Sequence, residues 1–370
     1  RLEALTGQIN IGNILANNIQ NNLTVFGGDL LSNELNLLSG PYSLISAHVN
    51  SITGGVNVSG GDLNIGTVVG GLNINSLNLS GDPIIYSQAD GVALNLAGFS
   101  NLFTTNGSDF IVLSGGDVNY NGAASTINAT APSANGGKIS INAGVTFTAP
   151  ALPTPAPCTT CNFTITGESN SGGNINLSGL SLVTNSNSVS LTSSKGLSGL
   201  SNANISIGSI TTSGRAAAIN SGAAGAAGGS VSIISQGTLT TGAIITNGGA
   251  GANAINGGAG GAGGAGGSLT LNTNGTVLTG LITSSGGAAG NGANGVNRGD
   301  AGGAGGIGGT AGALNLTLGS TANLGAITAI GGIGGTAGAG RTGEDIFGNR
   351  NGGAGGVGGH AGNSGQIDIL

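Results

Sequence analysis

The chain has 370 residues, of which 80 are Gly, 5% are charged and 3% are aromatic, and it contains neither Trp nor Met. A charged fraction far below the roughly 25% of ordinary soluble domains argues against conventional globular domains. A mean hydropathy of +0.26 with a net charge of −6 argues against a disordered chain, and seven basic residues leave no electrostatic footprint for nucleic acid.

Residues 1–148 carry a recurring triplet in which a polar residue, usually Asn, separates two apolar ones. Alternation of period two predicts strands with one buried face, and the uneven spacing predicts irregular coils of a β-solenoid with loops of different length. The triplets lie at Ile9–Ile11, Leu35–Leu37, Val56–Val58, Leu63–Ile65, Leu72–Ile74, Leu77–Leu79, Leu94–Leu96 and Val118–Tyr120, with a further one at Ile175–Leu177.

The central residue of each triplet is expected to face solvent. Regular Asn side chains either stack as an amide ladder, bind a flat ligand such as a glycan or ice, or simply keep an uncharged strand soluble. Many triplets also form Asn-x-Ser/Thr, as at Asn78-Leu79-Ser80, a match that a Ser/Thr-rich composition produces by itself.

Residues 149–161 form a Pro-rich loop that contains both cysteines of the chain, Cys158 and Cys161. A redox CxxC pair begins a helix, and no helical pattern follows this one; a zinc site needs four ligands, and there is no second pair. The spacing is interpreted as a local disulfide in an exposed loop, consistent with an oxidising compartment. Residues 162–214 return to solenoid coils.

Residues 215–370 contain three blocks that align without a gap: Ser230–Gly249, Ser268–Gly287 and Ala313–Gly332. Each opens with an apolar–polar–apolar triplet, has Ile thirteen positions after the first apolar residue, and ends in Gly-Gly. Two short strands with turns in about 20 residues match one solenoid coil. Gln366–Leu370 is similar to the opening of a fourth block.

Four glycine-rich segments interrupt these blocks and grow along the chain: 215–229, 250–267, 288–312 and 333–365. Several repeat Gly-Gly-x, with apolar Ile307, Ile333 and Val357 at the third position. Collagen is excluded, since all seven prolines lie between Pro41 and Pro157, and a floppy linker needs no period of three. The pattern predicts polyglycine II arms aligned by the coils, the longest reaching about 50 Å at ~3.1 Å per residue. The predicted fold is therefore all-β, a single-stranded parallel β-solenoid (β-helix) with polyglycine II-type arms in its C-terminal half.

Catalytic and cofactor motifs are not found. The two histidines, His48 and His360, are far apart, the acidic residues are scattered apart from Glu344-Asp345, and no nucleophile elbow, phosphate loop or calcium nonapeptide is present. We expect no enzyme, no metal and no cofactor. Arg298, Gly299 and Asp300 form an RGD tripeptide, a candidate adhesion motif, although most occurrences of so short a motif are incidental.

The recurrent Gly-Gly-x-apolar-x-apolar pattern, as in Gly136–Ile141, Gly172–Leu177, Gly228–Ile233 and Gly266–Leu271, resembles that of filamentous-haemagglutinin-like exoproteins. The resemblance implies a right-handed parallel β-helix exported to the surface of a Gram-negative-type bacterium and used in adhesion or aggregation. The glycine-rich arms are more similar to the polyglycine II bundles of some antifreeze proteins and phage tail adhesins.

These features together predict an extracellular or cell-surface structural fibre or adhesin, in attachment, aggregation or a biofilm matrix. No stretch is apolar enough to span a membrane as a helix, and a chain beginning at Arg1 is expected to be a processed product or a fragment. A strand that ends at Leu370 without a polar cap predicts either a truncation or head-to-tail self-assembly. Other expected partners are cell-surface glycans or receptors; the alternative function is a glycan- or ice-binding module.

Overall fold

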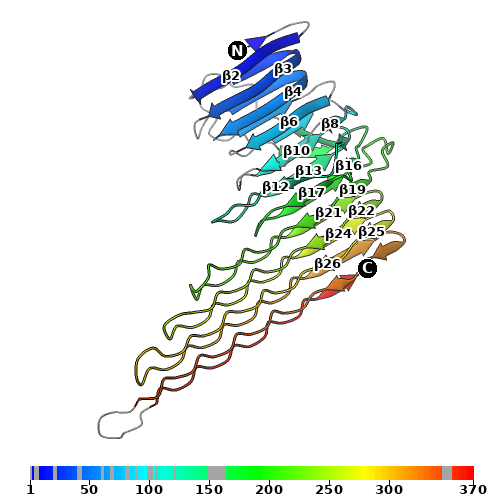
Figure 1. Cartoon of the computed structure of the whole chain (residues 1–370). Coiled ribbons are helices and arrows are strands. Elements are labelled where there is room, and N and C mark those ends of the chain that lie inside the picture. Colours follow the sequence, from blue (N-terminus) through cyan, green and yellow to red (C-terminus); the bar gives the residue numbers. More distant parts are fainter. Residues whose placement is uncertain are drawn as a thin grey trace.

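The computed structural model in Figure 1 is a long stack of strands from which extended segments project to one side. It describes residues 2–3, 8–19, 23–39, 44–59, 62–66, 71–79, 84–87, 90–97, 103–104, 107, 109–120, 122–148, 164–343 and 352–370. Side chains are described within these ranges at 90–94, 96, 107 and from 109 onward. All elements of the described residues are strands, and no helix is among them.

The N-terminal strands lie parallel to one another. They are β1 (Leu2–Glu3), β2 (Gln8–Ile19), β3 (Leu23–Ser39), β4 (Leu44–Ser59), β5 (Asp62–Gly66) and β6 (Gly71–Leu79). Four of them, β2, β3, β4 and β6, are the longest of the described strands. β3 pairs with both β2 and β4, and β4 pairs in turn with β5 and β6. Register shifts interrupt these long pairings, as expected where the triplet spacing is uneven.

From β7 onward the strands fall into three columns, each strand pairing in parallel with the equivalent strand of the next turn of chain. The first column is β7 (Ile84–Ser87), β10 (Phe110–Ser114), β13 (Ile139–Ala143), β18 (Val189–Ser193), β21 (Val231–Ser235), β24 (Leu269–Thr273), β27 (Leu314–Leu318) and β30 (Ile367–Ile369).

The second column is β8 (Leu94–Ala97), β11 (Val118–Asn119), β16 (Ile175–Leu177), β19 (Ile205–Ile207), β22 (Leu239–Thr241), β25 (Val277–Thr279) and β28 (Ala322–Leu324). The third is β9 (Phe103–Thr104), β12 (Ser125–Asn128), β17 (Leu180–Val183), β20 (Ile210–Thr211), β23 (Ile244–Ile245), β26 (Ile282–Thr283) and β29 (Ile327–Thr328). Figure 1 shows the columns continuing along the length of the stack.

The register predicted from the aligned blocks is confirmed. Leu269 pairs with Val231 on one side and with Leu314 on the other, and Ile282 likewise lies between Ile244 and Ile327. β30 pairs with β27, so Gln366–Leu370 does open a further turn. The prediction of two strands per block is wrong, because each block has three. The triplet marked the first strand and the repeated Ile marked the third, whereas a second-column strand such as β22, with one apolar residue in three, shows no period in sequence.

The core is a set of stacked aliphatic side chains on the inner side of the three columns. In the first column Val231, Ile233, Leu269 and Leu271 are at most 1% exposed, whereas the residues between them face outward, as alternation requires. Burial of each such side chain stabilises the fold by about 1.5–3 kcal/mol. Phe110 and Tyr120 are buried among these aliphatic layers.

One antiparallel pair departs from the stack. β14 (Val145–Thr148) pairs with β15 (Thr164–Glu168), and β15 is largely exposed. The pair flanks the Pro-rich segment in sequence, with Thr148 paired to Thr164. Cys158 and Cys161 themselves lie outside the described residues, and their disulfide stays a prediction.

Candidate functional site: the glycine-rich arms and their tips

The four glycine-rich segments leave the strand stack after the third column and return before the first. We call them arm 1 (215–229), arm 2 (250–267), arm 3 (288–312) and arm 4 (333–365), each with an outgoing and a returning half. Figure 1 shows them lying side by side and projecting to the same side of the stack. The tip of arm 4, residues 344–351, lies outside the described residues.

Buried hydroxyl groups hold the base of the first three arms closed. Thr212 Oγ1 donates to Gly229 O at 2.6 Å in arm 1, and Thr246 Oγ1 donates to Gly267 O at 2.8 Å in arm 2. Ser284 Oγ accepts from Gly312 N–H at 3.1 Å, which closes arm 3, and donates to Gly267 O of arm 2 at 2.6 Å. Each hydroxyl residue lies two positions after the first Ile of a third-column strand, where the chain leaves the stack. Sequence analysis missed these residues, although a hydroxyl residue at a fixed offset after Ile is a visible signal.

Corresponding halves of successive arms are joined by one backbone hydrogen bond every third residue. In the outgoing halves, Gly251 N–H donates to Ala288 O at 2.8 Å, and Ala289 N–H donates to Ile333 O at 2.9 Å. In the returning halves, Gly263 N–H donates to Ile307 O at 2.9 Å. The bonds link residues far apart in sequence, so each arm is positioned by the turn of the stack from which it leaves.

A second set of bonds crosses between outgoing and returning halves. Gly290 N–H donates to Gly261 O at 2.8 Å, Gly306 N–H donates to Gly290 O at 2.9 Å, and Gly335 N–H donates to Gly306 O at 2.9 Å. These bonds run in a zigzag from arm 2 to arm 4. The arms therefore form two hydrogen-bonded layers of chain with backbone contacts between them.

The close approach of these backbones explains why two residues of every three are glycine. A Cβ on Gly261 would lie 1.8 Å from Ala223 O, and one on Gly306 would lie 2.1 Å from Gly261 O. The third residue of each turn points away from both layers, which leaves Ile307 57%, Ile333 71% and Val357 73% exposed. The period of three is thus a steric requirement.

Asn side chains accept some of the N–H groups on the outer side of the outgoing halves and at their bases. Asn253 Oδ1 accepts from Asn291 N–H at 2.8 Å, and Asn291 Oδ1 accepts from Thr336 N–H at 2.9 Å. Asn247 and Asn294 make the same contact to Ser285 and Ala339. Amide ladders also occur on the strand stack, where Asn176 Nδ2 donates to Asn119 Oδ1 at 2.7 Å. Of the interpretations left open for regular Asn, stacking is therefore present at these positions.

The tips of arms 1 and 2 have the same turn conformation. An exposed Ile is followed by an Asn with positive φ, 60° at Asn220 and 56° at Asn256, a backbone region that Asn tolerates better than most residues. Both tips then turn back through a glycine with positive φ, Gly222 and Gly257.

The tip of arm 3 carries the RGD tripeptide in a tight turn. Asp300 N–H donates to Asn297 O at 3.1 Å, and Gly299, at φ 82°, occupies the third position, where type II turns need a positive φ. Arg298 is exposed. The Asp300 side chain accepts from Asn297 N–H at 2.8 Å, and Arg341 of arm 4 donates to Val296 O beside it. The three residues predicted from sequence thus lie together at an arm tip.

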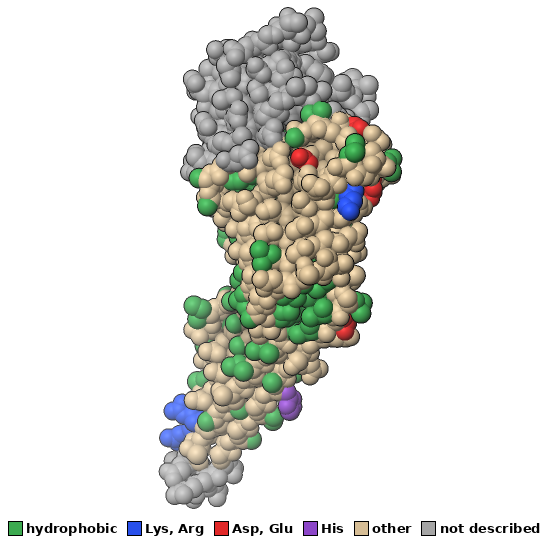
Figure 2. Space-filling model, turned by 90° about the vertical axis from the view of Figure 1, so that its right-hand side faces the viewer, with side chains coloured by type: hydrophobic (Ala, Val, Ile, Leu, Met, Phe, Trp, Pro, Cys, Tyr) green, Lys and Arg blue, Asp and Glu red, His purple; other side chains and the backbone are tan. Residues whose placement is uncertain are grey.

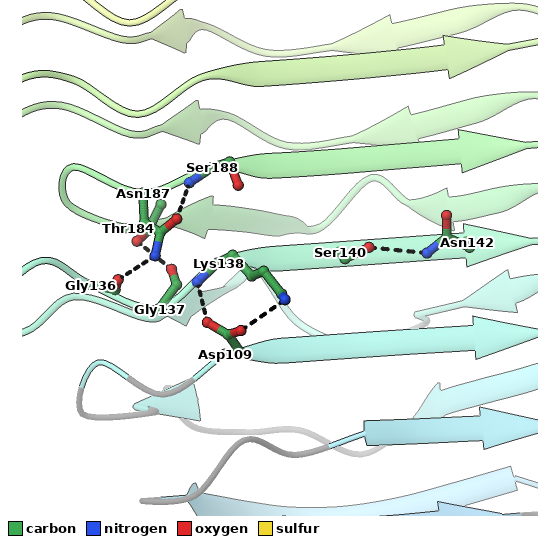
Figure 3. A network of polar contacts seen from close by, with 9 residues as sticks. All are labelled: Asp109, Gly136, Gly137, Lys138, Ser140, Asn142, Thr184, Asn187 and Ser188. Carbon is green, nitrogen blue, oxygen red and sulfur yellow. Dashed lines mark hydrogen bonds and ion pairs between the residues drawn. The ribbon is translucent and has the colours of Figure 1, made fainter. Parts of the chain in front are cut away.

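Polar contacts elsewhere tie successive turns of the stack together. Figure 3 shows Asp109 accepting from the Lys138 N–H at 2.8 Å and pairing with the Lys138 ammonium at 3.1 Å. Thr184 Oγ1 donates to Gly137 O at 2.6 Å in the same network. Of the two histidines, His360 lies exposed on arm 4. In the described part of the chain, no three His, Cys, Asp or Glu residues are grouped as a metal site would require.

A scan of protein-family models found no matching family, and searches of curated proteins and of solved structures found no significant match. No helix in the described ranges is long and apolar enough to cross a membrane.

Proposed function

We propose that the strand stack is a single-stranded parallel β-solenoid and that the arms are polyglycine II helices. Support for the solenoid comes from the three parallel columns, whose register repeats from turn to turn. Support for polyglycine II comes from the period of three in both the hydrogen bonds and the exposed residues, and from carbonyls too close to admit a Cβ.

On this basis the protein is a non-enzymatic structural fibre or adhesin on the outside of a bacterial cell, which mediates surface attachment, aggregation or biofilm formation. The observation that carries the proposal is the hydrogen-bonded arm bundle, which holds a row of turns away from the solenoid. The Gly-Gly-x-apolar-x-apolar motifs that resemble filamentous-haemagglutinin-like exoproteins support it further, since they lead into first- and second-column strands such as β13, β16, β21 and β24.

Head-to-tail self-assembly is part of this proposal. Coils that pair only in parallel have distinct faces, so one copy adds to another in a single direction. Repetition of such a contact gives an open fibre. Electron microscopy of native material should show fibres with an axial repeat of about 4.8 Å per coil, whereas purely discrete particles would contradict self-assembly.

Attachment is tested with beads coated with the intact protein and applied to host cells or to immobilised cell-surface glycans. Arg298→Ala should lower bead attachment severalfold, because it removes a cation from the RGD turn at an arm tip. Arg215→Ala is the matched control, since Arg215 is an exposed arginine at the base of arm 1 and its loss should leave attachment unchanged. Beads that attach no better than uncoated ones would contradict an adhesin.

The alternative is a module that binds glycan or ice. The regular spacing of outward residues on the arms favours it, because a repeated ligand surface needs a repeated array. A soluble glycan array and an ice-recrystallisation assay test it directly; activity in the second without cell attachment would replace the adhesin proposal.

A further inference from the structure

The arm bundle has two outer faces, and within the described residues Asn side chains accept backbone N–H groups on only one of them. The outgoing face is formed by outward residues of the outgoing halves, and there Asn side chains accept the N–H groups of the next arm. The return face is formed by outward residues of the returning halves: Ala224, Ala227, Ala259, Ala262, Ala265, Ala301, Ala304, Ile307, Thr310, Ala354, Val357, His360 and Asn363.

On the return face, a regular series of backbone N–H and C=O groups makes no hydrogen bond within the described residues. The N–H groups of Ala262, Ala304, Ile307 and Val357 make no hydrogen bond within the described residues, and the carbonyl groups of Gly263 and Gly305 accept none there. These donors and acceptors repeat every three residues along an arm. Water satisfies them in an isolated molecule, and a second surface with the same repeat is able to replace that water.

The return face also has regularly spaced ridges and grooves. Outward side chains of successive arms line up as ridges parallel to the solenoid axis, about 9 Å apart because three residues of polyglycine II span that distance. Glycine backbone forms the floor between ridges. At the base of the arms there is a groove of about 580 Å³, and Gly229, Gly267, Gly312, Ser230 and Ser268 are among its lining residues.

Charge is absent from the return face, since none of its outward residues is Asp, Glu, Lys or Arg. Charged side chains are also few on the part of the surface in Figure 2. A face without charge meets no electrostatic repulsion when it is paired with a copy of itself. The exposed Ile307 and Val357 instead gain from the removal of water.

We propose that the return face pairs with the return face of a second copy of this chain about a two-fold axis, the ridges of each copy entering the grooves of the other. Identical ridge spacing in the two copies makes such an isologous contact self-complementary. Arms about 30 Å long, stacked at about 4.8 Å, bury roughly 500–600 Å² per copy, which reaches the lower end of the range for specific interfaces. The pairing goes beyond the proposed function, because neither attachment nor head-to-tail stacking requires it.

Two variants separate this pairing from other contacts. Ile307→Arg with Val357→Arg places charges on the ridges of the return face. Ile330→Arg with Ile333→Arg places the same charges on exposed isoleucines of the outgoing face. All four positions are more than half exposed, so both variants should fold, and unchanged far-UV circular dichroism and melting temperature check this.

Sedimentation velocity over a concentration series measures the association. We expect a wild-type dimer whose dissociation constant rises at least tenfold in the return-face variant and stays within twofold in the outgoing-face variant. A wild type that is monomeric at all concentrations, or two variants with equal effects, would overturn the pairing. Open-ended oligomers that persist unchanged in the return-face variant would also overturn it, while leaving the head-to-tail proposal intact.

Discussion

The strand stack and the arm bundle hold the same chain together by opposite means. In the stack, side chains such as Ile233 and Leu271 fill the interior, and backbone hydrogen bonds run between turns. In the described part of the arms, the layers contact each other through backbone atoms, as Gly290 and Gly306 do, and the only buried apolar side chain is that of Ala252. Stability in the first region depends on side chains that are present, and in the second on side chains that are absent.

The arms also depend on the strand stack for their order more than the stack depends on the arms. Glycine loses more conformational freedom on folding than any other residue, and each backbone hydrogen bond returns only about 0.5–1.5 kcal/mol. A single arm therefore does not order itself. The stack aligns the arms at a fixed spacing through Thr212, Thr246 and Ser284 at their bases, and damage to the stack should reach the arms more readily than the reverse.

The largest expected effect comes from a cavity in the stack. Leu271→Ala removes a fully buried side chain from β24 and should lower the free energy of unfolding by about 2–5 kcal/mol, measured by denaturant titration. Leu278→Ala on the neighbouring strand β25 is the control, since Leu278 is 45% exposed. Equal losses from the two substitutions would contradict a core built from the inward columns.

The second prediction adds a methyl group to the arms, where the packing requires that side chains be absent. A Cβ on Gly305 would lie 2.0 Å from Gly335 O, whereas one on Gly358, at the equivalent position of arm 4, meets nothing within 4 Å. Gly305→Ala should cost about 1–3 kcal/mol by overpacking, confined to the arms, and Gly358→Ala should be neutral or slightly stabilising.

Hydrogen–deuterium exchange resolves the two regions in this experiment. Gly305→Ala should accelerate exchange at least tenfold at Gly335 and its neighbours, with the strands of the stack unchanged. Slow exchange in both variants would show that the arms do not pack through their glycine backbone.

The strand stack and the arms also differ in how much of their structure the sequence predicts. Inward residues such as Val231 and Leu314 repeat at aligned positions, so strands, register and core could be predicted. The second-column strands could not, because Leu239–Thr241 has only one apolar residue and so shows no alternation. The period of three indicated which residues of the glycine-rich segments are exposed, such as Ile307 and Val357. The Asn ladder was not assigned to the arms, since the acceptor for Thr336 N–H depends on which arm lies beside it.

Alkaline pH should affect the stack through its buried phenol. Burial raises the pKa of Tyr120 above its ordinary value of 10.0, opposed by a side-chain hydrogen bond with Ser125, and its hydroxyl donates to Ala123 O at 2.6 Å. Because the folded state favours the neutral form, this stabilisation is complete below about pH 10 and is lost as pH rises through the raised folded pKa.

Tyr120→Phe keeps the ring and removes the titrating group. It should cost about 0.5–1.5 kcal/mol at pH 8, and the difference in unfolding free energy from wild type should shrink between pH 10 and 12. A difference that is constant with pH in thermal melts would contradict the burial of the phenol as the cause.

The smallest expected effect lies on the outgoing face of the arms, where side chains do assist the backbone. Asn291→Ala removes the acceptor of Thr336 N–H and leaves that exposed donor to water, so the cost should be at most about 1 kcal/mol. Exchange should accelerate severalfold at Thr336. Asn363→Ala is the control, because exposed Asn363 makes no side-chain hydrogen bond within the described residues. Should both variants exchange alike, the Asn ladder would add nothing to an arm bundle already held by its backbone, and the contrast with the strand stack would be complete.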